Sequence, residues 1–534
     1  PDPSIIPIMK STLLGTSIIG SSRGSAPAQG GHAANPANGD QLDPAYAAPT
    51  DEEVARAIEL AEQAFPVYSA LPGKERAKFL RAIADEIESV VDHLAARGPL
   101  ETGLPEARMR GETARTTGQL RLFAALVEEG SWVDARIERA QPGREPLPKP
   151  DLRSMLRPLG PVAVFCASNF PLAFSVAGGD TASALAAGCP VVVKAHSSHP
   201  GVAEIVGTCV QRAAEASGMP EGVFSLLYGS GRSVGMTLVQ HPAIQAVGFT
   251  GSRAGGLALM EAAANRPQPI PVYAEMSSVN PVVLLPEAVD SRGEEIAEGL
   301  FASLTLGAGQ FCTNPGLIFL PDGHGEAFLK TLRLLIEDAP SAVMLNAGIC
   351  RAFKEATAGF ADTPGVETLA HSFTKQVENR AVPAVYGVNV RRFLEDSDLH
   401  GEMFGPATLV VRGSLEEIEA TIPELEGQLT ATVHGSEAEL AANASLVAAL
   451  ERRAGRLIFN GFPTGVEVCH SMVHGGPFPA TSDGRSTSVG TMAIHRFCRP
   501  VSWQAFPEAA LPAELRDANP LGIARLEDGA RVLP

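Results

Sequence analysis

The strongest constraint on the fold of this chain is an alternation of short apolar strands with helices between residues 161 and 264. The pattern predicts strands at 161–166, 191–194, 223–227 and 244–249, with helices at 172–187, 202–216, 234–240 and 255–264. Strands that are apolar almost throughout must be covered on both faces, which is typical of a parallel sheet in a doubly wound α/β fold. Such sheets bind ligands beyond the carboxyl ends of their strands.

A second α/β series runs to about residue 459, with strands expected at 281–285 and 315–320. A chain of 534 residues is too long for one core, so two or three domains are expected. Residues 142–158 are rich in Pro, Gly and basic residues and predict an extended excursion. The stretch from Met9 to Leu14 predicts a short opening strand or hairpin rather than a secretion signal.

The composition favours a small-molecule enzyme. A net charge of −18 and a pI near 5.2 would repel nucleic acid and anionic membranes, so neither partner is expected. No apolar run is long enough to span a bilayer. The seven cysteines are odd in number and lack metal-type spacing, which indicates a reducing cytoplasm and no metal site.

One cysteine stands out as a nucleophile. It lies in the short turn Gly309-Gln310-Phe311-Cys312-Thr313-Asn314, between a helix rich in small residues and an apolar strand. A structural cysteine would rather sit inside an apolar run, as Cys166 does. Backbone N–H groups around such a turn favour the thiolate, so we expect Cys312 to be ionisable and to attack a carbonyl carbon.

Two segments at predicted strand ends suggest a nucleotide cleft. Lys194 ends a strand and points to the ligand crevice, although a solvated lysine is the alternative. Phe249 to Gly256 links a strand to a helix whose N-terminus could hold a phosphate; an ordinary turn is the alternative. Residues 195–198 contain no acid to pair with a ribose 2′-hydroxyl, which favours NADP over NAD. Gly229-Ser230-Gly231 is interpreted as a plain turn.

Two polar residues are candidates for the chemistry at these strand ends. Asn169 follows the first strand and could donate to an oxyanion, although a turn or cap role is the alternative. Glu275 ends a strand beside Met276. In an apolar setting its pKa should rise toward the working pH, so that it could deprotonate water. The alternative is a solvated acid at a strand end.

These residues occur in an order and at separations that resemble the aldehyde dehydrogenase superfamily over nearly the whole chain. The resemblance includes Glu402-x-Phe404-Gly405-Pro406. In three segments the resemblance is to one branch of this superfamily. That branch contains 2-oxoglutarate semialdehyde (2,5-dioxovalerate) dehydrogenases and an NADP-dependent fatty aldehyde dehydrogenase. They are 167–172, 275–281 and 460–468.

The resemblance implies a catalytic cycle. Cys312 would attack the aldehyde, Asn169 and the Cys312 N–H would hold the oxyanion, and Glu275 would activate water to hydrolyse a thioester. It also implies a nicotinamide cofactor, with NADP preferred and NAD possible, bound by the following residues: Lys194, Ser197, Gly251, Ser252, Gly256, Glu402 and Phe404.

The resemblance also implies three parts. A cofactor-binding domain would comprise 1–141 and 159–275, a catalytic domain 276–490, and an oligomerisation arm and tail 142–158 and 491–534. The arm would join subunits into a homodimer or homotetramer.

The substrate residues follow the same resemblance. Arg115 falls where relatives line a substrate tunnel and could clamp a carboxylate, although it could also be a solvated helix arginine. Phe170 and Phe174 are expected to wall that tunnel. Where relatives carry Glu-Leu-Gly-Gly, this chain has Glu275-Met276-Ser277-Ser278. This departure bears on how freely the side chain of Glu275 can change its conformation.

Another departure is a histidine-containing loop. Where relatives carry Pro-Phe-Gly-Gly, this chain has His474-Gly475-Gly476-Pro477-Phe478-Pro479-Ala480. We expect His470 and His474 to have structural roles rather than to act as proton acceptors.

We therefore expect oxidation of 2-oxoglutarate semialdehyde to 2-oxoglutarate. A medium- or long-chain aldehyde dehydrogenase is the alternative within the fold, and an apolar tunnel with Arg115 turned outward would favour it. A cysteine esterase or thioesterase without redox chemistry is the alternative of another class. A non-catalytic relative is disfavoured by the presence of Cys312, Asn169 and Glu275.

Overall fold

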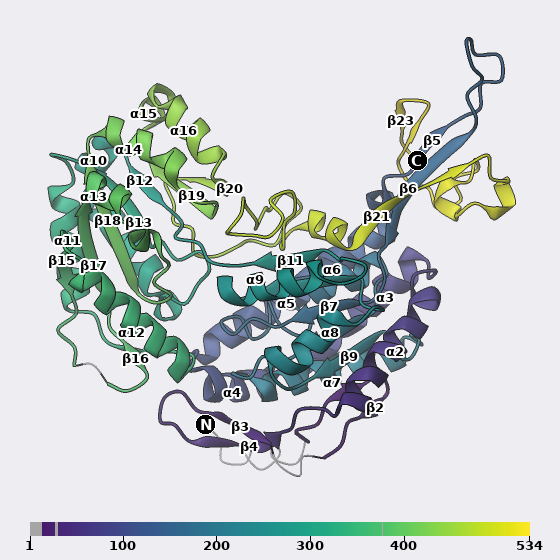
Figure 1. Ribbon diagram of the computed structural model, residues 1–534, viewed down its shortest axis with the longest axis horizontal. Coiled ribbons are helices and arrows are strands. Elements are labelled where there is room, and N and C mark those ends of the chain that lie inside the picture. The colour runs from purple at the N-terminus through teal and green to yellow at the C-terminus, as the bar shows by residue number, and fades with distance from the viewer. Residues whose placement is uncertain (1–12, 27–29, 376) are drawn as a thin grey trace.

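The computed structural model describes residues 13–26, 30–375 and 377–534. It contains two seven-stranded sheets, each flanked by helices, and a separate five-stranded sheet that projects from one end of the molecule (Figure 1). The α/β class and the doubly wound parallel sheets are as the sequence predicts. The expected opening strand at Met9 to Leu14 lies largely outside the described residues, but a short hairpin, β1 (Ile18–Ile19) and β2 (Ser22–Arg23), follows it.

The first sheet has the order β11-β10-β7-β8-β9-β1-β2, and its first five strands are parallel. Those five strands are β11 (Val272–Glu275), β10 (Ala246–Thr250), β7 (Val162–Phe165), β8 (Val191–Lys194) and β9 (Phe224–Leu227). Alternate residues of each strand enter different cores. In β7, Val162 and Val164 pack in one core, while Ala163 and Phe165 pack in the other.

Helices cover both faces of this sheet. One core includes residues of α3 (Gly73–Ser89), α4 (Val91–Thr102), α5 (Glu106–Glu129), α6 (Gly179–Ala187) and α7 (Pro200–Ala216). The opposite core includes residues of α2 (Asp51–Tyr68), α8 (Met236–Gln240) and α9 (Arg253–Ala264). A small two-stranded sheet, β3 (Gly31–Ala34) with β4 (Gln41–Tyr46), lies along the lower edge in Figure 1.

The second sheet has the order β15-β17-β18-β13-β12-β19-β20 and is parallel except for β15. Its strands are β12 (Val282–Leu284), β13 (Leu317–Pro321), β15 (Glu367–His371), β17 (Ala384–Asn389), β18 (Ala407–Gly413), β19 (Gln428–His434) and β20 (Ala454–Phe459). The flanking helices are α10 (Pro286–Thr305), α11 (Glu326–Glu337), α12 (Ala347–Asp362), α13 (Val390–Glu395), α14 (Leu415–Thr421), α15 (Glu437–Ala442) and α16 (Ala444–Glu451). The short strands β14 (Ala342–Val343) and β16 (Arg380–Ala381) pair separately.

The projecting arm is a sheet of order β21-β6-β5-β22-β23. It joins β5 (Arg136–Glu138) and β6 (Leu152–Pro158) to β21 (Cys498–Gln504), β22 (Arg525–Glu527) and β23 (Ala530–Val532). The arm therefore begins before residue 142, because β5 pairs with β6 rather than with the first sheet. Our sequence boundary placed β5 in the cofactor-binding domain, and that placement was wrong.

The helix predicted at 172–187 is shorter than expected, because α6 starts only at Gly179. Residues 172–178 form turns and bends whose backbone groups find other partners. The backbone N–H groups of Leu172 and Ala173 both donate to Oε1 of buried Glu112, at 2.9 and 3.0 Å. A carboxylate from α5 thus satisfies these two backbone donors.

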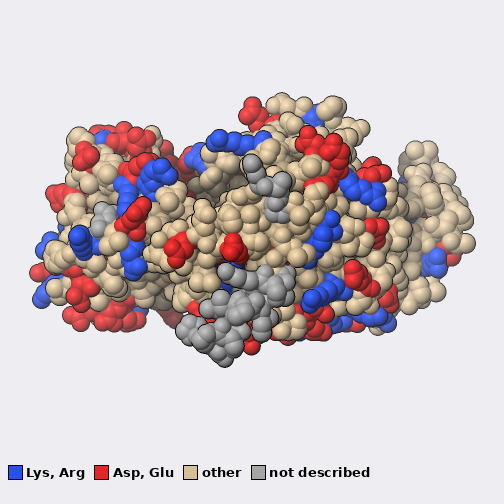
Figure 2. All heavy atoms as spheres, turned by 90° about the horizontal axis from the view of Figure 1, so that it is seen from below, with Lys and Arg blue, Asp and Glu red and all other residues tan. Residues whose placement is uncertain are grey.

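Charged side chains of both signs lie on the surface (Figure 2). On the face in Figure 2, acidic and basic side chains are interspersed rather than gathered into one basic patch. Among the described residues, none of the helices is long and apolar enough to cross a membrane.

Candidate active site

Cys312 lies in a tight turn between the two sheets. The turn follows α10 and a short 3-10 segment, η3 (Leu306–Gly309), and precedes β13. Gly309 has a φ of +67°, and a Cβ there would lie 2.3 Å from the carbonyl carbon of Gly405. Only glycine fits this approach. The Asn280 side-chain amide donates to the carbonyl oxygens of Cys312 and Asn314, at 2.8 and 2.9 Å, and so fixes the turn.

A histidine and a carboxylate lie directly beside the Cys312 sulfur. His474 Nε2 is 3.5 Å from Cys312 Sγ and 2.9 Å from Glu275 Oε1. Glu275 ends β11, and its other oxygen accepts a hydrogen bond from Ser488 at 2.9 Å. The backbone N–H of His474 donates to Thr487 Oγ1 at 2.8 Å. His474 and Glu275 are buried, so the three groups form a preorganised acid–base cluster.

The pKa shifts in this cluster differ from the sequence expectation. Burial raises the pKa of Cys312 well above its usual value, and the nearby charge of Glu275 raises it further. Burial alone would also raise the pKa of Glu275. The charge and hydrogen bond of His474, with bonds from Cys312 and Ser488, outweigh burial and leave the pKa of Glu275 below its usual value. The resting sulfur is therefore a thiol, and Glu275 is an ionised carboxylate; both expected pKa directions were wrong.

His474 lies at the centre of this cluster, whereas His470 lies outside it. Its side chain is 1% exposed and contacts both Glu275 and Cys312. His470, by contrast, is exposed. Its side chain has no hydrogen-bond partner among the described residues, although its backbone oxygen accepts a hydrogen bond from Thr491. A lone histidine in a loop gives no signal that separates these two cases. The sequence feature that could have distinguished His474 is its position in the segment His474-Gly475-Gly476, which replaces the usual loop of relatives.

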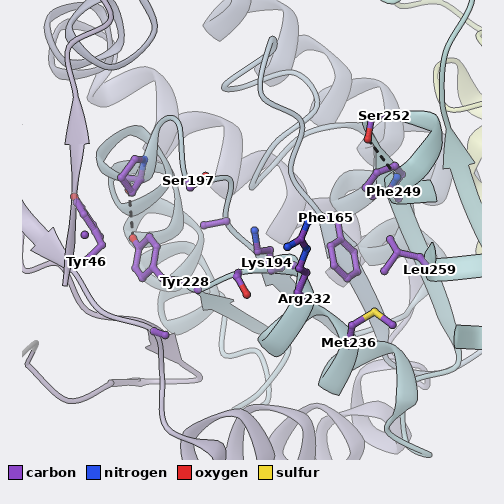
Figure 3. A pocket seen from close by; sticks show the side chains of 18 of the residues that line it. Tyr46, Phe165, Lys194, Ser197, Tyr228, Arg232, Met236, Phe249, Ser252 and Leu259 are labelled. Carbon is purple, nitrogen blue, oxygen red and sulfur yellow. Dashed lines mark hydrogen bonds between the residues drawn. The ribbon is translucent and has the colours of Figure 1, made fainter. Parts of the chain in front are cut away.

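A cavity near the carboxyl end of the first sheet has a volume of about 1090 Å³ (Figure 3). Lys194, Ser197, Arg232 and Ser252 are among the residues that line it. Buried Lys194 has no ion-pair partner among the described residues, and burial lowers its pKa. Ser252 caps α9 by accepting the N–H of Gly255, at 3.2 Å. The free N–H groups of this helix start suit a phosphate.

Two glycine-rich segments near this cavity differ from our interpretation. Gly229, Ser230, Gly231 and Arg232 line the cavity, so Gly229-Ser230-Gly231 is more than a plain turn. Gly256 does not line it. A Cβ at Gly256 would lie 2.5 Å from Met276 Sδ, so this glycine allows α9 to pack closely on the residue after Glu275.

A second cavity, of about 470 Å³, continues from the first to Cys312. Gly251, Glu402 and Phe404 line it together with Asn169. One amide hydrogen of Asn169 is donated to the Gln310 carbonyl at 3.0 Å, which orients the side chain beside the cysteine turn. Burial raises the pKa of Glu402 to about 7.

A third cavity, of about 610 Å³, lies on the other side of Cys312. Phe170, Phe174 and Phe311 form part of its wall, with edge-on ring contacts of 5.2 and 5.3 Å. Cys312 is the one described residue that lines both this cavity and the preceding one. The sulfur therefore separates a nucleotide-sized cleft from a smaller cavity.

Three arginines line this third cavity. Arg115 stacks on Phe174 at 5.3 Å and donates Nε to the Val466 carbonyl at 3.3 Å. Both of its terminal nitrogens are buried and have no hydrogen-bond partner among the described residues. Burial lowers the pKa of Arg115, but an arginine stays charged at neutral pH. Arg108 and Arg456 also line the cavity, and our sequence reasoning missed both.

The fold and the site together define a class. Residues 25–341 match the model of the aldehyde dehydrogenase family, which is more than half of the chain, so the chain belongs to that family. It is 52% identical over 520 residues to alpha-ketoglutaric semialdehyde dehydrogenase 2 of Azospirillum brasilense, covering 97% of this chain and 99% of that protein. It is 48% identical to an alpha-ketoglutaric semialdehyde dehydrogenase of Acinetobacter baylyi, covering 90% and 91%.

Solved structures support the same fold. An NADP-dependent enzyme of Escherichia coli superposes with a TM-score of 0.78 at 24% identity, covering 92% of this chain and 98% of that one. A betaine aldehyde dehydrogenase of Staphylococcus aureus superposes with a TM-score of 0.79 at 20% identity, covering 93% and 98%. At these identities the likeness concerns the fold alone.

Proposed function

We propose that this aldehyde dehydrogenase oxidises 2-oxoglutarate semialdehyde to 2-oxoglutarate, with NADP+ as the preferred cofactor. The observation that carries the proposal is the position of Cys312 between a nucleotide-sized cleft and a cavity lined by arginines. Relatives of 52% and 48% identity bear the name of this activity.

In the first step, Cys312 attacks the aldehyde carbon and becomes a thiohemiacetal. Because the resting sulfur is a thiol, its proton must leave as the carbon–sulfur bond forms. The proton passes to solvent through the cavities that meet at Cys312. The Nε2–H of His474, which donates to ionised Glu275 at 2.9 Å, also lies 3.5 Å from the sulfur and stabilises the thiolate as it forms. The second amide hydrogen of Asn169 and the Cys312 backbone N–H hold the oxyanion.

When bound, the nicotinamide supplies the hydride acceptor that turns the thiohemiacetal into a thioester. Glu275 then takes a proton from water, which attacks the thioester carbonyl and releases the acid and the Cys312 thiol. A carboxylate that stays ionised, as the lowered pKa of Glu275 requires, is ready to act as this base. Ser488 holds its second oxygen, so the base is oriented before water arrives.

The substrate proposal rests on Arg115. A buried guanidinium with two unpartnered terminal nitrogens is costly unless an anion binds it, and it offers a carboxylate two parallel hydrogen bonds. The far carboxylate of an oxo-acid semialdehyde meets that requirement. The alternative of a medium- or long-chain aldehyde required Arg115 to turn outward, and its burial argues against that alternative.

The cofactor proposal rests on the first cavity. Its lining contains Lys194 and Arg232 but no aspartate or glutamate among the described residues. Ser197 lies where an acid would otherwise repel a 2′-phosphate, so the electrostatics favour NADP+. The unpaired Lys194 and the start of α9 fit a nucleotide, with Glu402 and Phe404 toward the nicotinamide end. These features argue against a thioesterase without redox chemistry.

Assembly and location belong to the same proposal. The projecting arm leaves β21 and β23 as unpaired edges and exposes Leu147, Val532 and Leu533. Edges and apolar side chains of this kind favour pairing with a second copy, as a homodimer or homotetramer. All seven cysteines are free, which is consistent with the cytoplasm.

The proposal is tested by initial rates of nicotinamide reduction with carboxylated and plain aldehydes, with NADP+ and NAD+ in parallel. We expect a higher kcat/KM for 2-oxoglutarate semialdehyde than for hexanal, and a higher one with NADP+ than with NAD+. Equal values for the two aldehydes would overturn the substrate assignment. A Cys312→Ala enzyme that still reduced the cofactor would overturn the mechanism.

A further inference from the structure

The cluster around Cys312 brings together three different metal-ligating atoms. The ligand atoms of Cys312, His474 and Glu275 all lie within 4.8 Å of one another. Sulfur, imidazole nitrogen and carboxylate oxygen are the donors that zinc(II) takes in proteins. Sites with three protein ligands keep the fourth position open. The three residues are too far apart in sequence to show metal-type spacing, so this set appears only in the folded chain.

The spacing of the donors suits a tetrahedral ion. Zinc bonds of about 2.3 Å to sulfur and about 2.0 Å to nitrogen place those two atoms about 3.5 Å apart at a tetrahedral angle. Cys312 Sγ and His474 Nε2 are 3.5 Å apart. Nitrogen and oxygen ligands lie about 3.3 Å apart in such a site, so the 2.9 Å between His474 and Glu275 must widen only slightly.

The protons of the cluster can also be accommodated. Nε2 of His474 must give up its hydrogen to bind a metal, and the ring can then carry its proton on Nδ1. Nδ1 of His474 is buried and has no hydrogen-bond partner among the described residues, so no existing contact opposes this tautomer. The Cys312 thiol releases its proton to solvent as the metal–sulfur bond forms.

We propose that Cys312, His474 and Glu275 form an inhibitory site for zinc(II). The ion replaces the thiol proton, occupies the space where the aldehyde carbon would bind, and blocks the nucleophile reversibly. Its open fourth position faces the cavities that meet at Cys312. The proposal needs only the contacts among these three side chains, so it does not depend on which aldehyde the enzyme oxidises.

Cobalt(II) is the direct probe, because it takes the same donors as zinc and is coloured. Titration of the full-length protein in thiol-free buffer should give one ion per chain, with a thiolate-to-cobalt charge-transfer band in the near ultraviolet. Zinc should displace the cobalt and abolish the band. The same band in a Cys312→Ala protein, or no band in the unsubstituted protein, would overturn the proposal.

Ligand variants test the other two donors. His474→Gln should weaken zinc binding by at least about tenfold, measured by competition with a chromophoric chelator, and Glu275→Gln should weaken it in the same direction. The matched control is Cys469→Ser combined with His470→Gln. These metal-binding residue types lie in the same loop, at the half-buried Cys469 and the exposed His470. Loss of binding in the control, with retention in His474→Gln, would assign the metal elsewhere.

Kinetics supply an independent readout. Zinc inhibition should be competitive with the aldehyde and fully reversed by a chelator. Inhibition that persists after chelation would contradict reversible coordination. Because the cobalt spectrum needs no turnover, absence of the band counts against the metal site alone. An enzyme inactive toward the semialdehyde that still showed the band would count against the proposed substrate alone.

Discussion

His474 Nε2 lies 2.9 Å from Glu275 Oε1, although the two residues are 199 positions apart in the chain. The same nitrogen lies 3.5 Å from Cys312 Sγ. One imidazole therefore connects the proposed nucleophile to the proposed hydrolytic base. This relationship predicts separate defects for the two residues.

Replacing His474 by Gln should slow formation of the thioester, because the forming thiolate of Cys312 loses the imidazole N–H that stabilises it. Hydrogen bonds to a charged group contribute about 1.5–3 kcal/mol, so the pre-steady-state burst of NADPH should slow by roughly 10- to 150-fold. Stopped-flow absorbance measures this burst. The control is His470→Gln, since His470 is exposed and its side chain has no hydrogen-bond or ion-pair partner among the described residues. An unchanged burst rate in His474→Gln would remove His474 from the mechanism.

Replacing Glu275 by Gln should leave an acyl group on Cys312, because the water that hydrolyses the thioester loses its base. We expect a burst followed by steady-state turnover about 10²-fold slower or more. Intact-protein mass spectrometry after quenching should detect an adduct of the acyl mass. The same mass in a Cys312→Ala protein would mean that the acyl group is carried elsewhere.

Replacing Arg115 by Met should raise the KM for 2-oxoglutarate semialdehyde while leaving that for hexanal nearly unchanged. Hydrogen bonds to a charged group contribute about 1.5–3 kcal/mol, which corresponds to roughly 10- to 150-fold. Steady-state kinetics with both aldehydes measures the difference. Arg110→Met is the control on the same helix, because Arg110 is exposed and paired with Glu106 and Asp92. Equal losses for both aldehydes would point to a structural role for Arg115.

Replacing Arg232 by Ala should weaken NADP+ more than NAD+, because only NADP+ carries a 2′-phosphate to pair with the guanidinium. We expect a loss of about tenfold to a hundredfold for NADP+ and little change for NAD+. Isothermal titration calorimetry with each cofactor measures the two affinities. The control is Arg212→Ala, an exposed arginine of α7. An equal loss for both cofactors would contradict recognition of the 2′-phosphate.

Cofactor affinity should fall as the pH drops below 7. Burial raises the pKa of Glu402 to about 7, although hydrogen bonds from Ser277 and the Ser278 backbone oppose the rise. If the ionised carboxylate accepts ribose hydroxyls, binding is full above pH 7. Below pH 7 it weakens by about tenfold per unit, because the proton must leave first.

NAD+ is the better ligand for this measurement, because the 2′-phosphate of NADP+ titrates nearby. Fluorescence titration from about pH 5.5 to 8.5 should show the dependence in the unsubstituted enzyme and in the exposed control Glu395→Gln. Glu402→Gln should bind NAD+ more weakly at pH 8, with a flat profile. A slope that survives in Glu402→Gln would assign the titration to another group.

The first sheet was predictable because its strands are apolar along their whole length, a pattern set by burial on both faces. Lys194 ends β8 as its sequence position indicated. The helix at 172–187 was not predictable, because its first residues are ordered by Glu112 of a distant helix. Likewise, β5 joins the arm through pairing with β6, and no local pattern encodes that choice.

The site, too, was predictable where a local motif marks a residue, and not where its properties depend on distant residues. Motif order located Cys312, Glu275 and Asn169, since each sits in a turn or strand end with its own local signature. It did not give the pKa directions of Cys312 and Glu275. Burial and the charge of Glu275 raise the pKa of Cys312. The pKa of Glu275 is lowered against its burial mainly by His474, which reaches the cluster from a loop 162 residues after Cys312. Arg108 and Arg456 were not predicted to line the cavity, because the sequence around an arginine does not show whether its side chain faces a cavity or solvent.

Cys312 is the single described residue common to the cavities on its two sides. An aldehyde and a dinucleotide therefore need not pass each other on the way in. In the proposed mechanism, the reduced dinucleotide can leave while the acyl group is still attached, and the acid can leave afterwards through the arginine-lined cavity. In such an enzyme, release of the reduced dinucleotide can overlap in time with hydrolysis of the thioester to the acid.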